Sequence, residues 1–235
     1  MLYIVGIGPG CAEMMTSQAY ECCRRADMIV GYTVYAELMK KIFPDKEYHT
    51  TGMKKEEERV RYAMKMAETA DVALVCSGDA GIYGLAWHAY LMCGEYSAQI
   101  EVVPGISASI SGAALLGAPL TCDHAVISLS DLLVPKERIE KRLRACAAAD
   151  MVTVLYNPSS KKRADYLAWA ADIFLEHRPA ETVCGYARNI GRDGQEWGIM
   201  SLSELREFEA DMFTTVFIGN SDTKTINGKM VTMRA

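Results

Sequence analysis

The chain has 235 residues, of which 50% are hydrophobic and 23% are charged. This is the composition of a folded globular protein with one large domain or two small ones, and it excludes a disordered chain, a collagen-like fibre and a heptad rod. The 25 Lys and Arg residues against 30 Asp and Glu residues give a net charge of −5. Because a general nucleic-acid binder needs a positive field, we expect no nucleic-acid partner.

The cysteines and histidines follow no metal-binding pattern. None of the eight cysteines forms a Cys-x-x-Cys pair, and none of the four histidines has a partner at metal-ligand spacing, so we expect no metal site. Eight free thiols indicate a reducing cytoplasm. Residues 1–6 carry no basic leader, and the weakly polar run 102–120 contains two prolines and three glycines. We therefore expect a cytoplasmic protein without a membrane partner.

Strand-like and helical segments alternate through the first half of the chain. The expected strands are 2–5, 28–30, 72–76 and 99–103. The expected helices end near Arg25 and Phe43, span 54–70 and 85–93, and follow Pro104-Gly105. The clearest helix, 54–70, has an apolar face formed by Val60, Ala63, Met64 and Ala67. This alternation predicts a parallel sheet with crossover helices.

The second half repeats the α/β pattern after a break at Gly117-Ala118-Pro119, which predicts two domains, 1–118 and 119–235. The expected strands are 125–128, 152–156, 182–187, 195–200 and 215–218. The expected helices are 136–149, 160–176 and a short one capped by Ser201 and Glu204. Asn227-Gly228 predicts a two-residue hairpin near the end of the chain. The fold class is therefore two α/β domains, the second with a mixed sheet.

Three glycine loops directly follow strands of the first half: Gly6-Ile7-Gly8-Pro9-Gly10, residues 77–84 (SGDAGIYG) and residues 103–108 (VPGISA). Since ligands of α/β folds bind at the carboxyl edge of the sheet, we expect these loops to form one ligand site. Cys11 occupies the position of the third glycine of a dinucleotide fingerprint, which disfavours that cofactor. Asp79 is the single acid in the loops, and it either accepts hydrogen bonds from a ligand or caps the next helix.

These loops resemble the three motifs of the tetrapyrrole (corrin and porphyrin) methylase family. Further segments are similar to the branch of this family that methylates carbon 17 of a corrin precursor: residues 31–35, 77–84, 127–133, 155–158, 160–163, 188–192 and 214–221. The chain departs from the pattern at Ala80, where the wider family often has proline, and at Lys136, where the branch commonly has an aromatic residue. The resemblance covers essentially the whole chain.

The resemblance implies two α/β domains with a cofactor cleft between them, S-adenosyl-L-methionine as cofactor with S-adenosyl-L-homocysteine as product, and a homodimer. It implies a corrinoid tetrapyrrole substrate, methylated at carbon 17 with linked ring contraction during cobalamin biosynthesis. The residues implied in cofactor binding are Pro9, Gly78, Asp79, Ile82, Tyr83, Ser107, Ala108, Tyr156, Asn157, Asn189, Thr214 and Thr215.

The implied substrate carries acetate and propionate groups, so an acidic enzyme needs local cations to bind it. The candidates are Lys161, Lys162, Arg163, Arg188 and Arg192, with a solvated helix start as the alternative for 161–163. Asp131 is the candidate acid or base for ring contraction, and its alternative role is to cap the helix after Pro135. The alternative functions are a diphthine synthase, a ribosomal-RNA ribose methylase and a nucleotide-binding module without catalysis.

Overall fold

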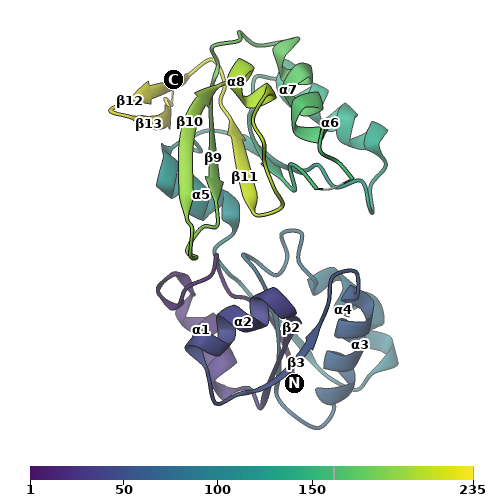
Figure 1. The fold of residues 1–235 in the computed structure, drawn as a ribbon. Coiled ribbons are helices and arrows are strands. Elements are labelled where there is room, and N and C mark those ends of the chain that lie inside the picture. The colour runs from purple at the N-terminus through teal and green to yellow at the C-terminus, as the bar shows by residue number, and fades with distance from the viewer. Residues whose placement is uncertain (161, 235) are drawn as a thin grey trace. The chain divides into compact units, whose positions relative to one another are not determined.

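The computed structural model describes residues 1–160 and 162–234 (Figure 1). The chain divides into two compact units, Met1–Ala108 and Ser109–Ala235. Each unit contains a five-stranded sheet with helices against it, so the α/β fold class expected from the sequence is confirmed. None of the helices within the described residues combines the length and hydrophobicity that a membrane span needs.

The division between the units falls after Ala108, the first residue of helix α5 (Ala108–Leu116), whereas the sequence pattern placed it after this helix, at Gly117-Ala118-Pro119. The packing of α5 explains the difference. A Cβ atom on Gly112 would lie 2.9 Å from the ring of Phe217, so α5 lies directly on the sheet of the second unit. The glycine-proline break therefore lies inside the second unit and not at its start.

The first unit contains a parallel sheet, as predicted. Its strands are β1 (Leu2–Gly6), β2 (Met28–Tyr32), β3 (Glu47–Thr51), β4 (Val72–Cys76) and β5 (Ile100–Val103), in the order β3-β2-β4-β1-β5. Its helices are η1 (Ala12–Met14), α1 (Ser17–Arg25), α2 (Thr33–Ile42), α3 (Glu56–Met66), α4 (Ala86–Met92) and η2 (Cys93–Glu95). Helices α1 and α2 cover one face of the sheet, and α3 and α4 cover the other (Figure 1).

Two apolar clusters, one on each face of this sheet, form the core of the first unit. Leu2 and Ile4 belong to the cluster under α3 and α4, whereas Val5 belongs to the cluster under α1 and α2. This division follows from the alternation of side chains along a strand. Val60 and Met64 of the predicted apolar face of α3 are fully buried, which confirms the helical period read from the sequence.

Strand β3 is absent from the sequence-based prediction. Its segment, Glu47–Thr51, is polar and mostly exposed or half-buried, and it pairs only with β2 at the edge of the sheet. An edge strand that buries little surface has no apolar pattern by which to recognise it. Only the tertiary structure, which supplies β2 as a hydrogen-bonding partner, reveals this strand.

The second unit contains a mixed sheet, also as predicted. Its strands are β7 (His124–Ser128), β8 (Val152–Tyr156), β9 (Val183–Arg188), β10 (Glu196–Ser201) and β11 (Thr214–Ile218), in the order β10-β9-β11-β8-β7. Strands β7 and β8 are parallel, and β11 runs antiparallel to both of its neighbours. Helices α6 (Lys136–Ala148), α7 (Tyr166–Leu175) and α8 (Leu202–Arg206) pack on the face opposite α5.

Helix α7 begins later than the sequence pattern indicated. The expected helix was 160–176, but the observed helix is Tyr166–Leu175. The backbone before it forms a separate turn, in which the Arg163 N–H donates to the Ser160 carbonyl at 2.9 Å. The Arg163 side chain also donates to Ser160 Oγ at 3.1 Å, so local hydrogen bonds replace the first helical turns.

The predicted hairpin and helix cap are both present. Asn227 and Gly228, with φ of 49° and 72°, connect β12 (Thr223–Ile226) to β13 (Lys229–Thr232). Positive φ at both turn residues is what a two-residue hairpin of this kind requires. Strand β13 also pairs with β6 (Gly117–Ala118), which forms a small third sheet. The capping box of Ser201 and Glu204 begins α8.

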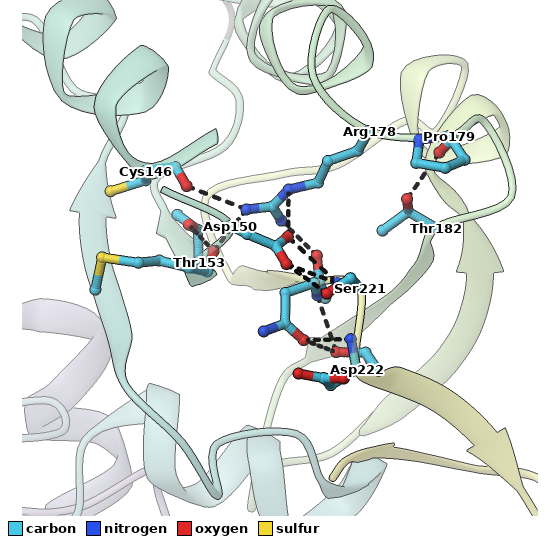
Figure 2. Close-up of polar contacts among 12 residues, drawn as sticks. Cys146, Asp150, Thr153, Arg178, Pro179, Thr182, Ser221 and Asp222 are labelled. Atoms are coloured by element: carbon cyan, nitrogen blue, oxygen red, sulfur yellow. Dashed lines mark hydrogen bonds and ion pairs between the residues drawn. The ribbon is translucent and has the colours of Figure 1, made fainter. Parts of the chain in front are cut away.

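Arg178, just after α7, holds one end of the second sheet together (Figure 2). Its side chain is only 3% exposed, and its Nε lies 3.6 Å from Asp150 Oδ1. The guanidinium donates to the carbonyl oxygens of Cys146, Met151 and Gly219. One buried cation thus connects the end of α6, the start of β8 and the residue after β11.

We predict that Arg178→Met lowers the free energy of unfolding by about 3 kcal/mol, because it leaves buried carbonyl groups without a donor. Arg206→Gln is the control, since Arg206 forms its ion pairs with Asp172 and Glu207 at the surface and should contribute less than about 1 kcal/mol. Urea denaturation of both variants measures the difference. Equal effects of the two substitutions would contradict a structural role for Arg178.

Candidate functional site

The three glycine loops meet at the carboxyl edge of the first sheet. They follow β1, β4 and β5, and β1 lies between the other two strands. The Gly8 N–H donates to the Gly78 carbonyl at 3.0 Å, and the Gly78 N–H donates to the Gly8 carbonyl at 2.8 Å. The expectation that these loops gather at one edge is confirmed.

Gly6 and Gly105 allow the loop backbones to approach closely. A Cβ atom on Gly6 would lie 2.7 Å from both the Gly105 nitrogen and the Gly78 carbonyl oxygen, which is closer than real Cβ contacts permit. A Cβ atom on Gly105 would likewise overlap the carbonyl oxygens of Gly6 and Gly78. These two glycines are therefore required by the contact between the loops, whether or not a ligand is bound.

Asp79 ties the second loop to the third. Its Oδ1 accepts hydrogen bonds from the Gly81 N–H at 2.8 Å and the Ile82 N–H at 3.2 Å. Its Oδ2 accepts from the Gly105 N–H at 3.0 Å. The residue before α4 is Leu85, and no side chain caps that helix, so Asp79 is not its cap. The carboxylate instead fixes the geometry of the edge.

The other residues of the first unit implied in cofactor binding lie on the same edge. Pro9 and Ser107 are buried, whereas Ile82 and Tyr83 are 42% and 55% exposed. Tyr83 has a φ of 55°, an unusual value for a residue with a side chain. Ala108, the last residue of the third loop, is also the first residue of α5. The edge therefore presents mainly backbone groups, a helix N-terminus and two exposed apolar side chains.

The corresponding residues of the second unit lie at one edge of the second sheet. Tyr156 ends β8, and Asn157 and Asn189 follow β8 and β9 with φ of 53° and 50°. Because β11 is antiparallel to these strands, its first residues, Thr214 and Thr215, lie at the same edge. Both threonines are buried. The structure thus brings all five predicted residues to one end of this sheet.

Tyr156 and Asn157 hold the backbone segments around them. The Tyr156 hydroxyl accepts a hydrogen bond from the Ser109 N–H at 2.7 Å, which satisfies an amide in the first turn of α5. The Asn157 side chain donates from Nδ2 to Ser128 Oγ at 2.9 Å, and this bond connects the ends of β8 and β7. Both residues therefore position the edge of the sheet in addition to any role in ligand binding.

Asp131 lies just after β7 at the same edge and is about one-third exposed (35% for its side chain). Its Oδ2 accepts a hydrogen bond from the Tyr166 hydroxyl at 2.8 Å, and its Oδ1 lies 3.9 Å from Arg163 Nε. The hydrogen bond to Asp131 is the main reason why the pKa of Tyr166 is raised. The N-cap of α6 is Pro135, without a side-chain cap, so the alternative role of Asp131 as a helix cap is wrong.

The candidate substrate cations differ in their surroundings. Arg188 forms ion pairs with Asp211 at 2.5 Å and Glu196 at 3.3 Å, and the charge of Asp211 is the main cause that raises the pKa of Arg188. Arg163 donates to the Leu129 carbonyl and lies near Asp131. The Arg192 guanidinium lies 6.0 Å from the centre of the Phe213 ring. Lys162 is exposed, and Lys161 lies outside the described residues.

The sequence motifs do not identify two residues at this edge, Tyr166 and Asp211. Tyr166 lies within the expected helix 160–176, and no sequence signal shows that its hydroxyl reaches Asp131. Asp211 accepts hydrogen bonds from the Phe213 N–H and from Thr214 Oγ1, which form a turn at the start of β11. The Asp-x-x-Thr spacing could have suggested this turn. Through Asp211, Arg188 holds the start of β11.

Lys136, at which the chain departs from the branch pattern, lies over two aromatic rings of α7. Its Nζ lies 4.5 Å from the centre of the Tyr166 ring and 4.6 Å from that of the Trp169 ring. A cation is attracted to the faces of such rings. Lys136 therefore covers the aromatic pair on α7, close to the Tyr166 hydroxyl that binds Asp131.

Potential metal ligands are dispersed within the described residues, and the thiol beside the second glycine loop is buried. In residues 1–160 and 162–234, no group of three or more His, Cys, Asp or Glu side chains is arranged to hold a metal ion. Cys76 ends β4 beside the second glycine loop, but burial raises the pKa of its thiol to about 11. A thiol with this pKa is protonated at neutral pH and is a poor nucleophile.

We predict that Asp79→Asn lowers the free energy of unfolding by about 1–3 kcal/mol, because an amide group replaces the oxygen that accepts from the Gly105 N–H. Hydrogen exchange should speed up at Gly105 in particular. Asp45→Asn, at an exposed turn of the same unit, is the control. Unchanged exchange at Gly105 in Asp79→Asn would show that the carboxylate does not hold the third loop.

Comparisons with known proteins identify the family of the chain. The sequence model of the family described as "Tetrapyrrole (Corrin/Porphyrin) Methylases" matches residues 1–206. A probable cobalt-factor III C(17)-methyltransferase of Methanocaldococcus jannaschii is 44% identical over 100% of this chain and 97% of its own length. A precorrin-3B C(17)-methyltransferase of a Sinorhizobium species is 34% identical over 96% of this chain and 91% of its own length.

The fold comparison gives the same result. The crystal structure of the methyltransferase CobJ superimposes with a TM-score of 0.90 at 31% identity and covers 99% of both chains. The sequence match, the full-length relatives and the shared fold together show that the chain belongs to the tetrapyrrole (corrin/porphyrin) methylase family.

Proposed function

We propose that the protein transfers a methyl group from S-adenosyl-L-methionine to carbon 17 of a corrin precursor, with linked contraction of the macrocycle, in cobalamin biosynthesis. The observation that carries this proposal is the end-to-end similarity to relatives named for C(17) methylation. The relative named for cobalt-factor III is 44% identical and the one named for precorrin-3B is 34% identical. This difference favours a cobalt-bearing substrate over a metal-free one.

The chemistry of the first edge fits a sulfonium cofactor. S-adenosyl-L-methionine supplies the methyl group when it is bound, and the displacement at sulfur needs alignment more than proton transfer. An edge made of backbone groups from three loops is suited to alignment, because Gly6 and Gly105 hold those loops in contact without intervening side chains. We propose that Pro9, Gly78 and Asp79 line the cofactor site, with Ile82 and Tyr83 as its apolar cover.

The N-terminus of α5 offers a place for the carboxylate of the cofactor. Helix α5 has nine residues, and Ser107 and Ala108 lie at its start. The positive end of a helix dipole favours an anion at a helix N-terminus. Tyr156 already accepts from the Ser109 N–H. We propose that it positions this helix start, while Asn157, Asn189, Thr214 and Thr215 contact the cofactor from the second unit.

We further propose that Asp131 moves protons during ring contraction, a step that rearranges oxygen functions and needs an acid or base. Support comes from its partial exposure at the edge of the second sheet and from its hydrogen bond to the Tyr166 hydroxyl. The Tyr166 hydroxyl donates to Oδ2, so we propose that Oδ1, which lies 3.9 Å from Arg163 Nε, is the oxygen that exchanges the proton.

Among the cations, we propose that Lys161, Lys162, Arg163 and Arg192 bind carboxylates of the substrate. Arg188 is already neutralised by Asp211 and Glu196, so we propose that it acts on the start of β11 and not directly on the substrate. The cytoplasmic location and the homodimer stay predictions. The alternatives are a diphthine synthase, a ribosomal-RNA ribose methylase and a non-catalytic module. Methyl transfer to a tetrapyrrole distinguishes the proposed function from all three.

The purified protein, incubated with methyl-labelled S-adenosyl-L-methionine and cobalt-factor III, should yield a tetrapyrrole that is heavier by one labelled methyl group. Mass spectrometry of the tetrapyrrole measures this gain, and a parallel reaction with precorrin-3B decides which substrate is preferred. Cofactor binding without a mass change on either tetrapyrrole would contradict the proposal and favour a binding module.

Asp131→Asn should let a methylated but uncontracted macrocycle accumulate, since an amide cannot exchange protons as a carboxylate does. Absorption spectra and mass spectra follow the two products. Asp165→Asn, a change to an exposed acid in the same region, is the control. Contracted product formed at the parental rate would remove Asp131 from the mechanism.

A further inference from the structure

Arg59, on α3, is a buried cation to which neither the sequence motifs nor the proposed function assigns a role. It is 3% exposed. The structure describes two such buried arginines, and the other, Arg178, has Asp150 at 3.6 Å. For Arg59, residues 1–160 and 162–234 provide no carboxylate within 4 Å of the guanidinium. A buried charge without a counter-charge is costly, so its presence requires an explanation.

The known contacts of Arg59 are all with neutral groups. Its Nε donates to Thr51 Oγ1 at 2.8 Å, and its Nη2 donates to the Gly52 carbonyl at 2.9 Å. Its Cζ lies 5.8 Å from the centre of the Tyr32 ring. Burial lowers the pKa of Arg59, and Glu56 acts on it only at longer range. A guanidinium stays charged in proteins, so the contacts orient the cation without neutralising it.

Arg59 lies at the same carboxyl edge as the glycine loops. Thr51 and Tyr32 are the last residues of β3 and β2, and β2 is the neighbour of β4. The charge of Arg59 is also felt by Cys76, the last residue of β4, which leads into the loop of Asp79. The cation therefore extends the candidate ligand edge sideways, past β4 to β2 and β3.

We propose that Arg59 is a carboxylate-binding residue of this edge and that its ligand is a peripheral carboxylate of the tetrapyrrole. A planar guanidinium held by hydrogen bonds to Thr51 and Gly52 is pre-organised to bind a carboxylate. A carboxylate from the ligand would supply the missing counter-charge. The inference rests on the proposed function for the identity of the substrate. The amino-acid carboxylate of the cofactor has the same chemistry, so the experiment separates the two sources.

The test compares Arg59→Gln with Arg61→Gln. Arg61 lies two residues further along the same helix, but its side chain is 42% exposed and pairs with Glu57 and Glu95. For each variant, KM for cobalt-factor III is measured at saturating S-adenosyl-L-methionine, and Kd for S-adenosyl-L-homocysteine is measured by calorimetry. Protein that has unfolded irreversibly changes neither constant, whereas reversible unfolding would raise both of them together, so a rise in KM alone is not imitated by loss of folded protein. Arg59→Lys, which keeps the charge, is the second variant.

We expect Arg59→Gln to raise KM for the tetrapyrrole by about 10-fold or more, with Arg59→Lys between it and the wild type and with an unchanged Kd for S-adenosyl-L-homocysteine. A change in the Kd alone would assign Arg59 to the cofactor and overturn the proposed source. Unchanged KM and Kd, with Arg61→Gln equally active, would show that Arg59 only holds the turn at Gly52. Absence of methyl transfer by the wild type would instead overturn the proposed function, and the tetrapyrrole assignment with it.

Discussion

Close backbone contact between three glycine loops determines the geometry of the first unit's ligand edge. Gly8 and Gly78 exchange two hydrogen bonds, and a side chain at Gly6 or Gly105 would force the loops apart. The carboxylate of Asp79 then joins the second loop to the third. An edge built in this way presents amide and carbonyl groups in fixed positions. Such an edge suits a reaction that depends on the alignment of two ligands more than on an acid or a base.

The second unit builds its edge differently, with side chains that hold strand ends. Asn157 and Asn189 adopt left-handed conformations directly after β8 and β9, and the antiparallel direction of β11 brings Thr214 beside them. Asn157 also donates to Ser128, which joins this edge to β7. The sheet therefore sets the positions of the hydroxyl and amide groups of this edge. This edge presents polar side chains, whereas the edge of the first unit presents mainly backbone groups.

Charge is distributed unevenly among the arginines of this acidic chain. Arg178 and Arg188 each have a carboxylate partner, at 3.6 Å and 2.5 Å respectively, and both stabilise the backbone around them. Arg59 is oriented only by neutral oxygens at the carboxyl edge of the first sheet. A cation that the protein itself leaves without a counter-charge has the most to gain from an anionic ligand, and the proposed substrate is rich in carboxylates.

The sequence by itself determined the α/β class, the apolar face of α3, the hairpin at Asn227-Gly228 and the gathering of the glycine loops, because these features depend on local periodicity, turn chemistry and the parallel order of strands. Only the tertiary structure decided that α5 belongs to the second unit and that β3 is a strand, since both depend on partners distant in the sequence. The same reason applies to the site. No local pattern reveals that Asp79 binds the Gly105 amide or that Tyr166 binds Asp131, because each pair joins segments far apart in the chain.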